Sequence, residues 1–257
     1  MRFIKRLIVL ILLLFILPAA ASIVWWMSLE RPGSWREADW SASGVLPAPG
    51  DVPEAVIHVM AARTGGLKGA LSLHSWIVLK KAGADAYDRY DKVGWGNPVR
   101  RNHYAPDARW YSNTPFIVKT VRGEAAERLI PRVEAAIAAY PHSKPGGYHI
   151  WPGPNSNSFV AHVLRQVPQL HAVLPANAVG RDYIAGGQTS FLAWFWDGEN
   201  DEFKLSAGGY AGISGGRVSG LEVNFLGLVA GVDVLHPALK IPGFGRLELT
   251  RTAWADK

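Results

Sequence analysis

The sequence predicts an α+β fold, an antiparallel sheet with packed helices, preceded by one N-terminal transmembrane helix. Three observations predict it. An uncharged stretch near the N-terminus is long enough to cross a bilayer, several later segments alternate apolar and polar residues as strands do, and two segments repeat apolar residues at helical spacing. We expect a membrane anchor or signal at residues 1–28, a linker at 29–52 and one folded domain at 53–257.

The N-terminal stretch predicts the compartment. Three basic residues, Arg2, Lys5 and Arg6, precede the uncharged run from Leu7 to Met27. That run reaches the roughly 20 residues needed to cross a bilayer core. Because the basic flank stays inside, the rest of the chain is expected to be exported. We therefore expect a single-pass protein of the inner membrane, with its domain in the periplasm or otherwise outside the cytoplasm.

Two interpretations of this stretch remain open. Ala19-Ala20-Ala21 resembles the cleavage site of a secretory signal peptide. The apolar run continues beyond it to Trp25 and Trp26, and paired tryptophans are typical of an anchor that stays at the membrane interface. These features favour an uncleaved anchor, but both interpretations export the domain.

The composition excludes several classes of function. The chain has no cysteine, which excludes disulfides, a thiolate metal site, a cysteine nucleophile and a lipid-anchored lipoprotein. The formal net charge of +6 includes the three basic residues ahead of the apolar run, and no Lys/Arg run follows. We expect the inner membrane as a partner through the N-terminal helix, and no nucleic acid.

The folded part shows strand patterns first and helix patterns next. Residues 30–53 are rich in Pro, Ser, Ala and Gly without periodicity, as a linker is. Strands are expected at Ala55–Ala61, Leu71–Leu79, Tyr87–Trp95 and Phe116–Val121, and again in a glycine-rich region at Phe191–Trp196, Leu221–Leu228 and Val232–Leu235. The clearest helices are Glu124–Ala139, which Pro131 should kink or divide, and Asn157–Gln166.

The second helix begins with the residues most suggestive of chemistry. A Pro/Gly-rich loop runs into the helix at Ser156. Helix N-termini present unpaired N–H groups and the positive end of the helix dipole, so they suit a nucleophile or an oxyanion. The spacing alone favours a structural alternative, since Asn and Ser are the favoured N-cap residues. His74, on an expected strand, could serve as the base or be a buried core histidine.

These two places resemble a known site. Asn155, Ser156, Phe159 and Val160 lie where circularly permuted papain-like proteins (NlpC-type and lecithin-retinol-acyltransferase-like) carry N-C-x-x-F-V. His74 lies at the position of their strand histidine, and Ser156 replaces their cysteine. Most of residues 53–246 also resembles an uncharacterised family of bacterial membrane-anchored proteins.

The resemblance implies roles for the candidate site residues. Ser156 would be the nucleophile and His74 its base, although 82 positions separate them, and they would meet in an open cleft. A serine hydroxyl also needs a group that orients the imidazole, because a helix N-terminus alone does not ionise it. Asp88 and Asp91 are the candidates for that group. The expected binding residues are Asn155, Trp151, Tyr148 and Trp76.

The implied function is that of a cell-envelope protein that binds, and on one interpretation hydrolyses, an amide or ester. The ligand would be a peptide, peptidoglycan or a lipid ester, and the enzyme a serine-type hydrolase or acyltransferase. The alternative is a non-catalytic interaction or structural module with a degenerate site. A third interpretation is a lipid-facing module, based on the anchor and the apolar C-terminal strands. No cofactor is expected, and no metal, since His142, His149, His162 and His171 lack ligand spacing.

Overall fold

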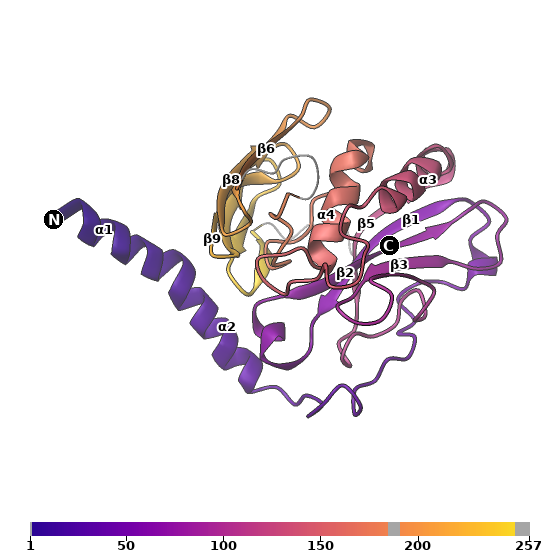
Figure 1. Ribbon diagram of the computed structural model, residues 1–257, viewed down its shortest axis with the longest axis horizontal. Helices are drawn as coiled ribbons and strands as arrows, with labels where there is room; N and C mark the ends of the chain where they lie inside the picture. The colour runs from indigo at the N-terminus through magenta and orange to yellow at the C-terminus, as the bar shows by residue number, and fades with distance from the viewer. Residues whose placement is uncertain (1, 185–190, 250–257) are drawn as a thin grey trace.

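The computed structural model describes residues 2–184 and 191–249, which form two antiparallel sheets and three long helical segments (Figure 1). The first sheet has five strands in the order β4-β3-β2-β1-β5. Its strands are β1 (Val56–Arg63), β2 (Leu73–Lys80), β3 (Asp88–Lys92), β4 (Val99–Arg101) and β5 (Phe116–Arg122). The expected strands of this region therefore coincide with β1, β2, β3 and β5, while the short β4 carried no clear pattern.

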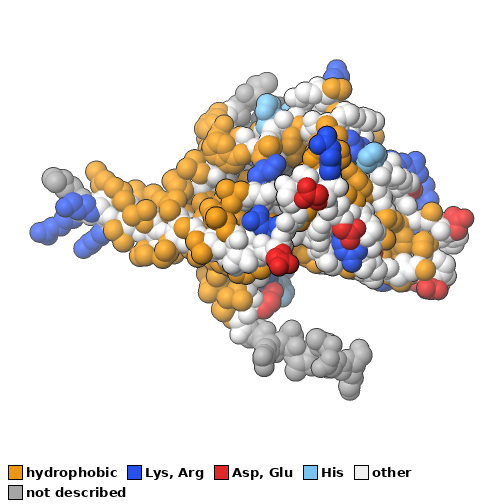
Figure 2. Space-filling view, turned by 90° about the horizontal axis from the view of Figure 1, so that it is seen from below, with side chains coloured by type: hydrophobic (Ala, Val, Ile, Leu, Met, Phe, Trp, Pro, Cys, Tyr) orange, Lys and Arg blue, Asp and Glu red, His pale blue; other side chains and the backbone are white. Residues whose placement is uncertain are grey.

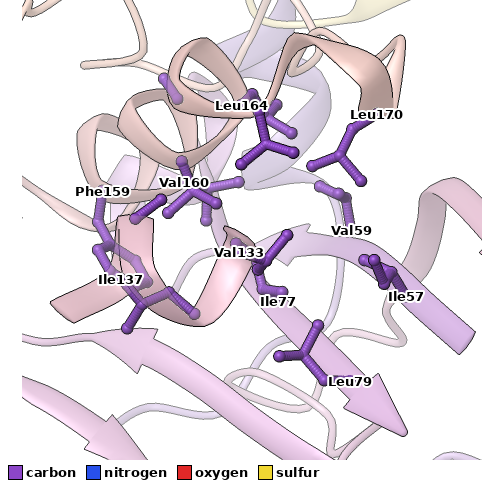
Figure 3. Packing of buried hydrophobic residues seen from close by; sticks show 14 of the residues in the cluster. Ile57, Val59, Ile77, Leu79, Val133, Ile137, Phe159, Val160, Leu164 and Leu170 are labelled. Atoms are coloured by element: carbon purple, nitrogen blue, oxygen red, sulfur yellow. The ribbon is translucent and has the colours of Figure 1, made fainter. Parts of the chain in front are cut away.

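Two helices, α3 (Gly123–Ala138) and α4 (Ser156–Gln166), pack against one face of this sheet. Figure 3 shows the contact, in which Val133 of α3 and Val160 of α4 meet Ile57 and Ile77 of the central strands. Full burial of one such side chain stabilises a fold by about 1.5–3 kcal/mol. This apolar contact therefore holds α4 in place on the first sheet. Pro131 lies inside α3 and does not divide it.

The other face of the first sheet holds a second apolar cluster built around aromatic rings. Trp76 and Val78 of β2 pack there with Met60 of β1 and with Trp110. The segment expected to be a linker covers part of this face, because Trp40 packs edge-on against Trp110 at 5.1 Å between ring centres. Residues 38–52 thus lie against the domain.

The N-terminal helix runs without interruption through α1 (Arg2–Ile11), the π-helical η1 (Leu12–Ile16) and α2 (Leu17–Met27). It is long and apolar enough to cross a membrane, as an anchor or as a signal sequence. One stripe of its second half is buried against the domain, made of Phe15, Ala19, Ser22 and Trp26. The Ser22 hydroxyl donates to the Ala70 carbonyl at 2.6 Å, and the Trp26 indole N–H donates to the Gly66 carbonyl at 2.9 Å. Polar bonds as well as apolar contacts hold the helix.

The second sheet is a seven-stranded meander in the order β12-β11-β10-β9-β8-β7-β6, and α4 lies between it and the first sheet (Figure 1). Its strands are β6 (Leu192–Asp197), β7 (Glu202–Ala207), β8 (Ala211–Gly216), β9 (Gly220–Phe225), β10 (Leu228–Asp233), β11 (Ala238–Ile241) and β12 (Gly245–Glu248). The sequence patterns indicated β6, β9 and β10, and they joined β9 to the start of β10 in one segment. Val234 and Leu235, expected in a strand, lie in the turn after β10. The expected single sheet is therefore two.

A buried cluster of charges lies under this second sheet. Glu222 of β9 accepts from the Arg181 guanidinium at 2.5 Å and from the Lys240 ammonium of β11. Beside them, Lys204 of β7 donates to Asp182 at 2.5 Å. The side chain of Arg181 is 3% exposed and that of Glu222 is 2% exposed. Three cations thus share two carboxylates, and the side chains of Arg181, Glu222 and Lys240 among them are almost wholly buried.

Candidate functional site

The pairing of β2 with β3 brings His74 and Asp91 together. Trp76 lies opposite Asp91 in the register, and side chains on a strand alternate between its faces. His74, Trp76 and Asp91 therefore share the face of the first sheet that carries the aromatic cluster. His74 Nε2 lies 3.2 Å from a carboxylate oxygen of Asp91.

The surroundings of this pair fix the imidazole ring. Trp110 stacks on it at 3.6 Å between ring centres, with the two planes within 3°. The Arg89 guanidinium lies 3.7 Å from Asp91, and 4.1 Å above the centre of the Trp76 ring. His74 is 3% exposed and Asp91 is fully buried.

The electrostatics define the protonation state of the pair. Burial lowers the pKa of His74 and outweighs the neighbouring carboxylate, which raises it. Burial pushes the pKa of Asp91 upward, but the hydrogen bond to His74 and the Arg89 charge together leave that pKa lowered. At neutral pH Asp91 is thus ionised and His74 neutral. An ionised carboxylate only accepts, so the imidazole carries its proton on Nε2.

The start of α4 is a complete capping box. The Asn155 side chain accepts from the backbone N–H groups of Asn157 and Ser158, and the Ser158 hydroxyl accepts from the Asn155 N–H. The Asn155 side-chain amide also donates to the carbonyls of Ile150 and Val179. Asn155 was expected as a binding residue. Its side chain instead makes hydrogen bonds that cap α4 and hold the loop before it.

Ser156 is the first residue of α4 and is 3% exposed. Its hydroxyl and its backbone N–H lie close enough to the phenolic oxygen of Tyr148 to act against the rise in the pKa of that phenol. Burial raises the pKa of Tyr148, and the two Ser156 donors only partly offset that rise, so the phenol stays neutral at physiological pH. Tyr148 therefore takes up the polar groups that a helix N-terminus offers to a ligand.

The side chains of His74 and Ser156 belong to opposite sides of β2. The neighbouring residue Ser75 points toward α4, where its hydroxyl donates to the Asn157 side chain at 2.8 Å. Alternation then directs His74 to the other face, where it stacks on Trp110. β2 and α4 pack against each other. Even so, in the part of the chain that the structure describes, the polar partner of His74 is Asp91 and that of Ser156 is Tyr148.

The remaining expected residues lie in three separate places. Asp88 forms a two-pronged ion pair with Arg101 at 3.0 and 2.9 Å on the exposed edge of the sheet, away from the imidazole. Trp76 is buried under Arg89. Trp151 is 45% exposed and donates to the Leu226 carbonyl in the second sheet.

Four residues with a part in this site were not among those expected: Ser75, Arg89, Trp110 and Asn157. Ser75 alternates with His74 on its strand, and Asn157 follows Ser156, so their positions were visible in the sequence. Trp110 and Arg89 carry no pattern that would place them beside His74. Two cavities lie away from these residues. One of about 520 Å³ is beside Arg63, Lys240 and Arg246, and one of about 620 Å³ is beside Lys119 and Arg132.

The fold and the site together define a mixed helix and antiparallel-sheet protein with one N-terminal apolar helix and a buried His–Asp pair. The chain belongs to the family described as "Protein of unknown function (DUF3750)", whose model matches residues 54–183. The match covers the first sheet, α3 and α4, and ends before the second sheet. No curated protein and no solved structure matches this chain.

Proposed function

We propose that this protein is a membrane-anchored, non-catalytic interaction module of the cell envelope, with a degenerate papain-like site. One observation carries the proposal: the Tyr148 oxygen faces the hydroxyl and the backbone N–H of Ser156. In a hydrolase, a helix N-terminus at this point would offer its N–H groups to the oxygen of a substrate carbonyl. Here a side chain of the same chain supplies that oxygen.

The position of the imidazole supports the same proposal. A serine hydroxyl attacks a carbonyl only when a base removes its proton during the attack. His74 is neutral and could accept a proton on Nδ1, but its ring lies on the face of β2 opposite α4. In this arrangement His74 thus does not serve Ser156 as its base.

The second candidate function is a serine-type hydrolase or acyltransferase that acts on a peptide, peptidoglycan or lipid ester. The contact that favours it is the His74–Asp91 pair, which Trp110 holds in one plane. An oriented, neutral imidazole with its proton directed at a carboxylate is what a general base requires. This function would need Tyr148 to leave Ser156, and His74 to reach it.

The location is part of the proposal. We propose that the helix is an uncleaved single-pass anchor of the inner membrane, with its N-terminus in the cytoplasm and the domain in the periplasm. Arg2, Lys5 and Arg6 on the first turns support this direction. The burial of Ser22 and Trp26 against the domain supports retention of the helix.

A topology experiment tests this location. With alkaline phosphatase fused after Lys257, which is active only when exported, we expect full activity. The same position fused to green fluorescent protein through the general secretion route should stay dark. A reversed pattern would reject the orientation. Edman sequencing of the purified chain should read the first residues of the sequence, starting at Met1 or Arg2. A start near Ser22 would reject the uncleaved anchor.

Covalent labelling separates the two candidate functions. The interaction module predicts that a serine-directed fluorophosphonate labels the full chain in detergent micelles no more than it labels the Ser156→Ala variant. Because the chain has no cysteine, Ser156→Cys provides a clean second probe. Its thiol should react with iodoacetamide more slowly than that of the exposed control Ser143→Cys, since it is buried and lacks a base.

The opposite result would establish the hydrolase. Labelling that disappears in Ser156→Ala and drops sharply in His74→Ala would show a nucleophile with its base. A Ser156→Cys thiol that reacts faster than the Ser143→Cys control would show the lowered pKa of an active papain-like thiol. Either outcome would overturn the interaction-module proposal.

A further inference from the structure

The second sheet has its polar and apolar faces reversed. Antiparallel sheets with one solvated face normally turn their apolar side chains toward the core and their polar ones outward. Here Lys204, Glu222 and Asn224 are directed inward, toward Arg181 and Asp182. The residues between them on the same strands are directed away from the rest of the protein.

The outward face is apolar throughout its described strands. It is made of the alternate residues of each strand, among them Trp194, Trp196, Ile213, Leu221, Val223 and Leu239. Trp194 is 62% exposed, Trp196 56% and Leu221 61%. The registers place these residues side by side, for example Ile213 opposite Val223 and Val232 opposite Leu239. A continuous apolar surface of this kind on a folded protein marks a site of contact with a partner or a membrane.

The N-terminal helix adjoins this sheet. Phe15 packs on Phe225 at the end of β9, with 5.6 Å between ring centres, and Trp25 packs on Phe244, between β11 and β12, at 6.0 Å. Figure 2 shows the hydrophobic side chains continuing from the helix onto the adjoining part of the domain. The surface is thus continuous with a segment whose own surroundings are lipid.

The positions of these contacts along the helix indicate how deep the second sheet would lie in a bilayer. Phe15 and Trp25 are ten residues apart, which is about 15 Å along an α-helix. The hydrocarbon core of a bilayer is about 30 Å thick, so this interval is about one leaflet. If the two tryptophans lie at the interface, the end of β9 lies near the middle of the bilayer.

We infer that the outer face of the second sheet is buried among the acyl chains of the membrane leaflet next to the domain. The inference rests on the position of this sheet and stands whether or not Ser156 is a nucleophile. The helix fixes the sheet at the membrane, and the sheet adds an apolar surface that the helix alone does not provide.

The turns of the sheet fit this location. Those beside the helix carry Tyr210, Leu226 and Phe244, while those at the other end of the strands carry the charged Glu199 and Arg217 together with the exposed Val234 and Leu235. Backbone groups in hydrocarbon must be satisfied within the protein. In the turn nearest the middle of the helix, the Leu226 N–H donates to the Tyr210 carbonyl at 2.5 Å, and the Leu226 carbonyl accepts from the Trp151 indole at 3.0 Å. The apolar end of the sheet can therefore enter lipid without leaving these polar groups unpaired.

Fluorescence of single-cysteine variants tests the inference. The full chain is reconstituted into phosphatidylcholine/phosphatidylglycerol vesicles, with an NBD probe on Val223→Cys or Ile213→Cys of the face. Arg217→Cys, in a charged turn of the same sheet, is the matched control. We expect the two face probes to be quenched by nitroxide-labelled lipid, with an iodide quenching constant several-fold below that of the control.

Two outcomes would overturn the inference. Equal iodide quenching at all three positions would show that the face is in water. Protection from both iodide and lipid nitroxide would show that a protein, such as a second copy of this chain, covers it. If the labelled variants unfold, brominated lipid and the intrinsic tryptophan fluorescence decide instead. Replacing Trp194 and Trp196 with Phe should then remove a large part of the quenching seen in the unsubstituted chain, and unchanged quenching would reject lipid contact.

Discussion

Replacing Glu222 with Gln should destabilise the protein by about 3–5 kcal/mol, the usual cost of removing one partner from a buried ion pair. Glu222 accepts from Arg181 and from Lys240, and its loss leaves Lys240 without its carboxylate partner and Arg181 with only Asp182, at 3.8 Å. The measurement is thermal unfolding of the full chain in detergent micelles, followed by circular dichroism. Glu127→Gln, an exposed residue on α3, is the control and should change stability by less than about 0.5 kcal/mol. Equal melting temperatures for the two variants would contradict the prediction.

Acid should reproduce this loss. Burial pushes the pKa of Glu222 upward, but the charges of Arg181 and Lys240 outweigh it and lower that pKa from 4.5 to about 2. A carboxyl group whose pKa is lower in the folded state stabilises the fold above its unfolded pKa and loses that contribution as pH falls through the folded one. Stability should therefore fall between pH 4.5 and about 2. The part of this fall due to Glu222 should be missing in the Glu222→Gln variant.

Replacing Asn157 with Ala should cost about 3 kcal/mol, since it removes three hydrogen bonds of a buried side chain, each worth about 1 kcal/mol. The Asn157 amide donates to the carbonyls of Leu73 at 2.9 Å and Val179 at 2.8 Å, and its oxygen accepts from Ser75. The side chain thus ties β2, α4 and the loop before the second sheet to one another. The loss should appear in the same melting experiment.

Gln166→Ala provides the matched control for this prediction. Gln166 lies at the exposed end of the same helix, so its removal should leave the melting temperature nearly unchanged. An Asn157→Ala variant as stable as Gln166→Ala would contradict the prediction. A large loss would place it in the structural framework of the site.

Local patterns predicted four strands of the first sheet and both helices. β1 and β2 are near-continuous apolar runs, as strands buried on both faces are, and the apolar positions of α3 around Val133 repeat at helical spacing. The second sheet was harder, since its strands are short and contain several glycines. Leu221, Glu222 and Val223 do alternate, but alternation shows only that a strand has two different faces. Which face is turned inward depends on Arg181 and Asp182, about 40 positions earlier in the chain.

The same limit applies to the candidate site. The sequence indicated Ser156 at a helix start and Asp91 on the strand that follows His74. It did not indicate that Tyr148 faces Ser156, or that Trp110 stacks on His74, because these contacts join segments without any shared pattern. Nor could it show that His74 points away from α4, since the faces of β2 are distinguished only by what packs on each.

The buried stripe of the N-terminal helix limits how far the domain can move away from that helix. A domain on a free tether sweeps a volume set by the length of the tether and meets ligands at many heights above the membrane. Here Ser22 and Trp26 bond to the domain, and residues 38–52 lie along its side. With the helix as the proposed membrane anchor, the domain would stay at one height, and a ligand would have to come close to the lipid surface to reach it.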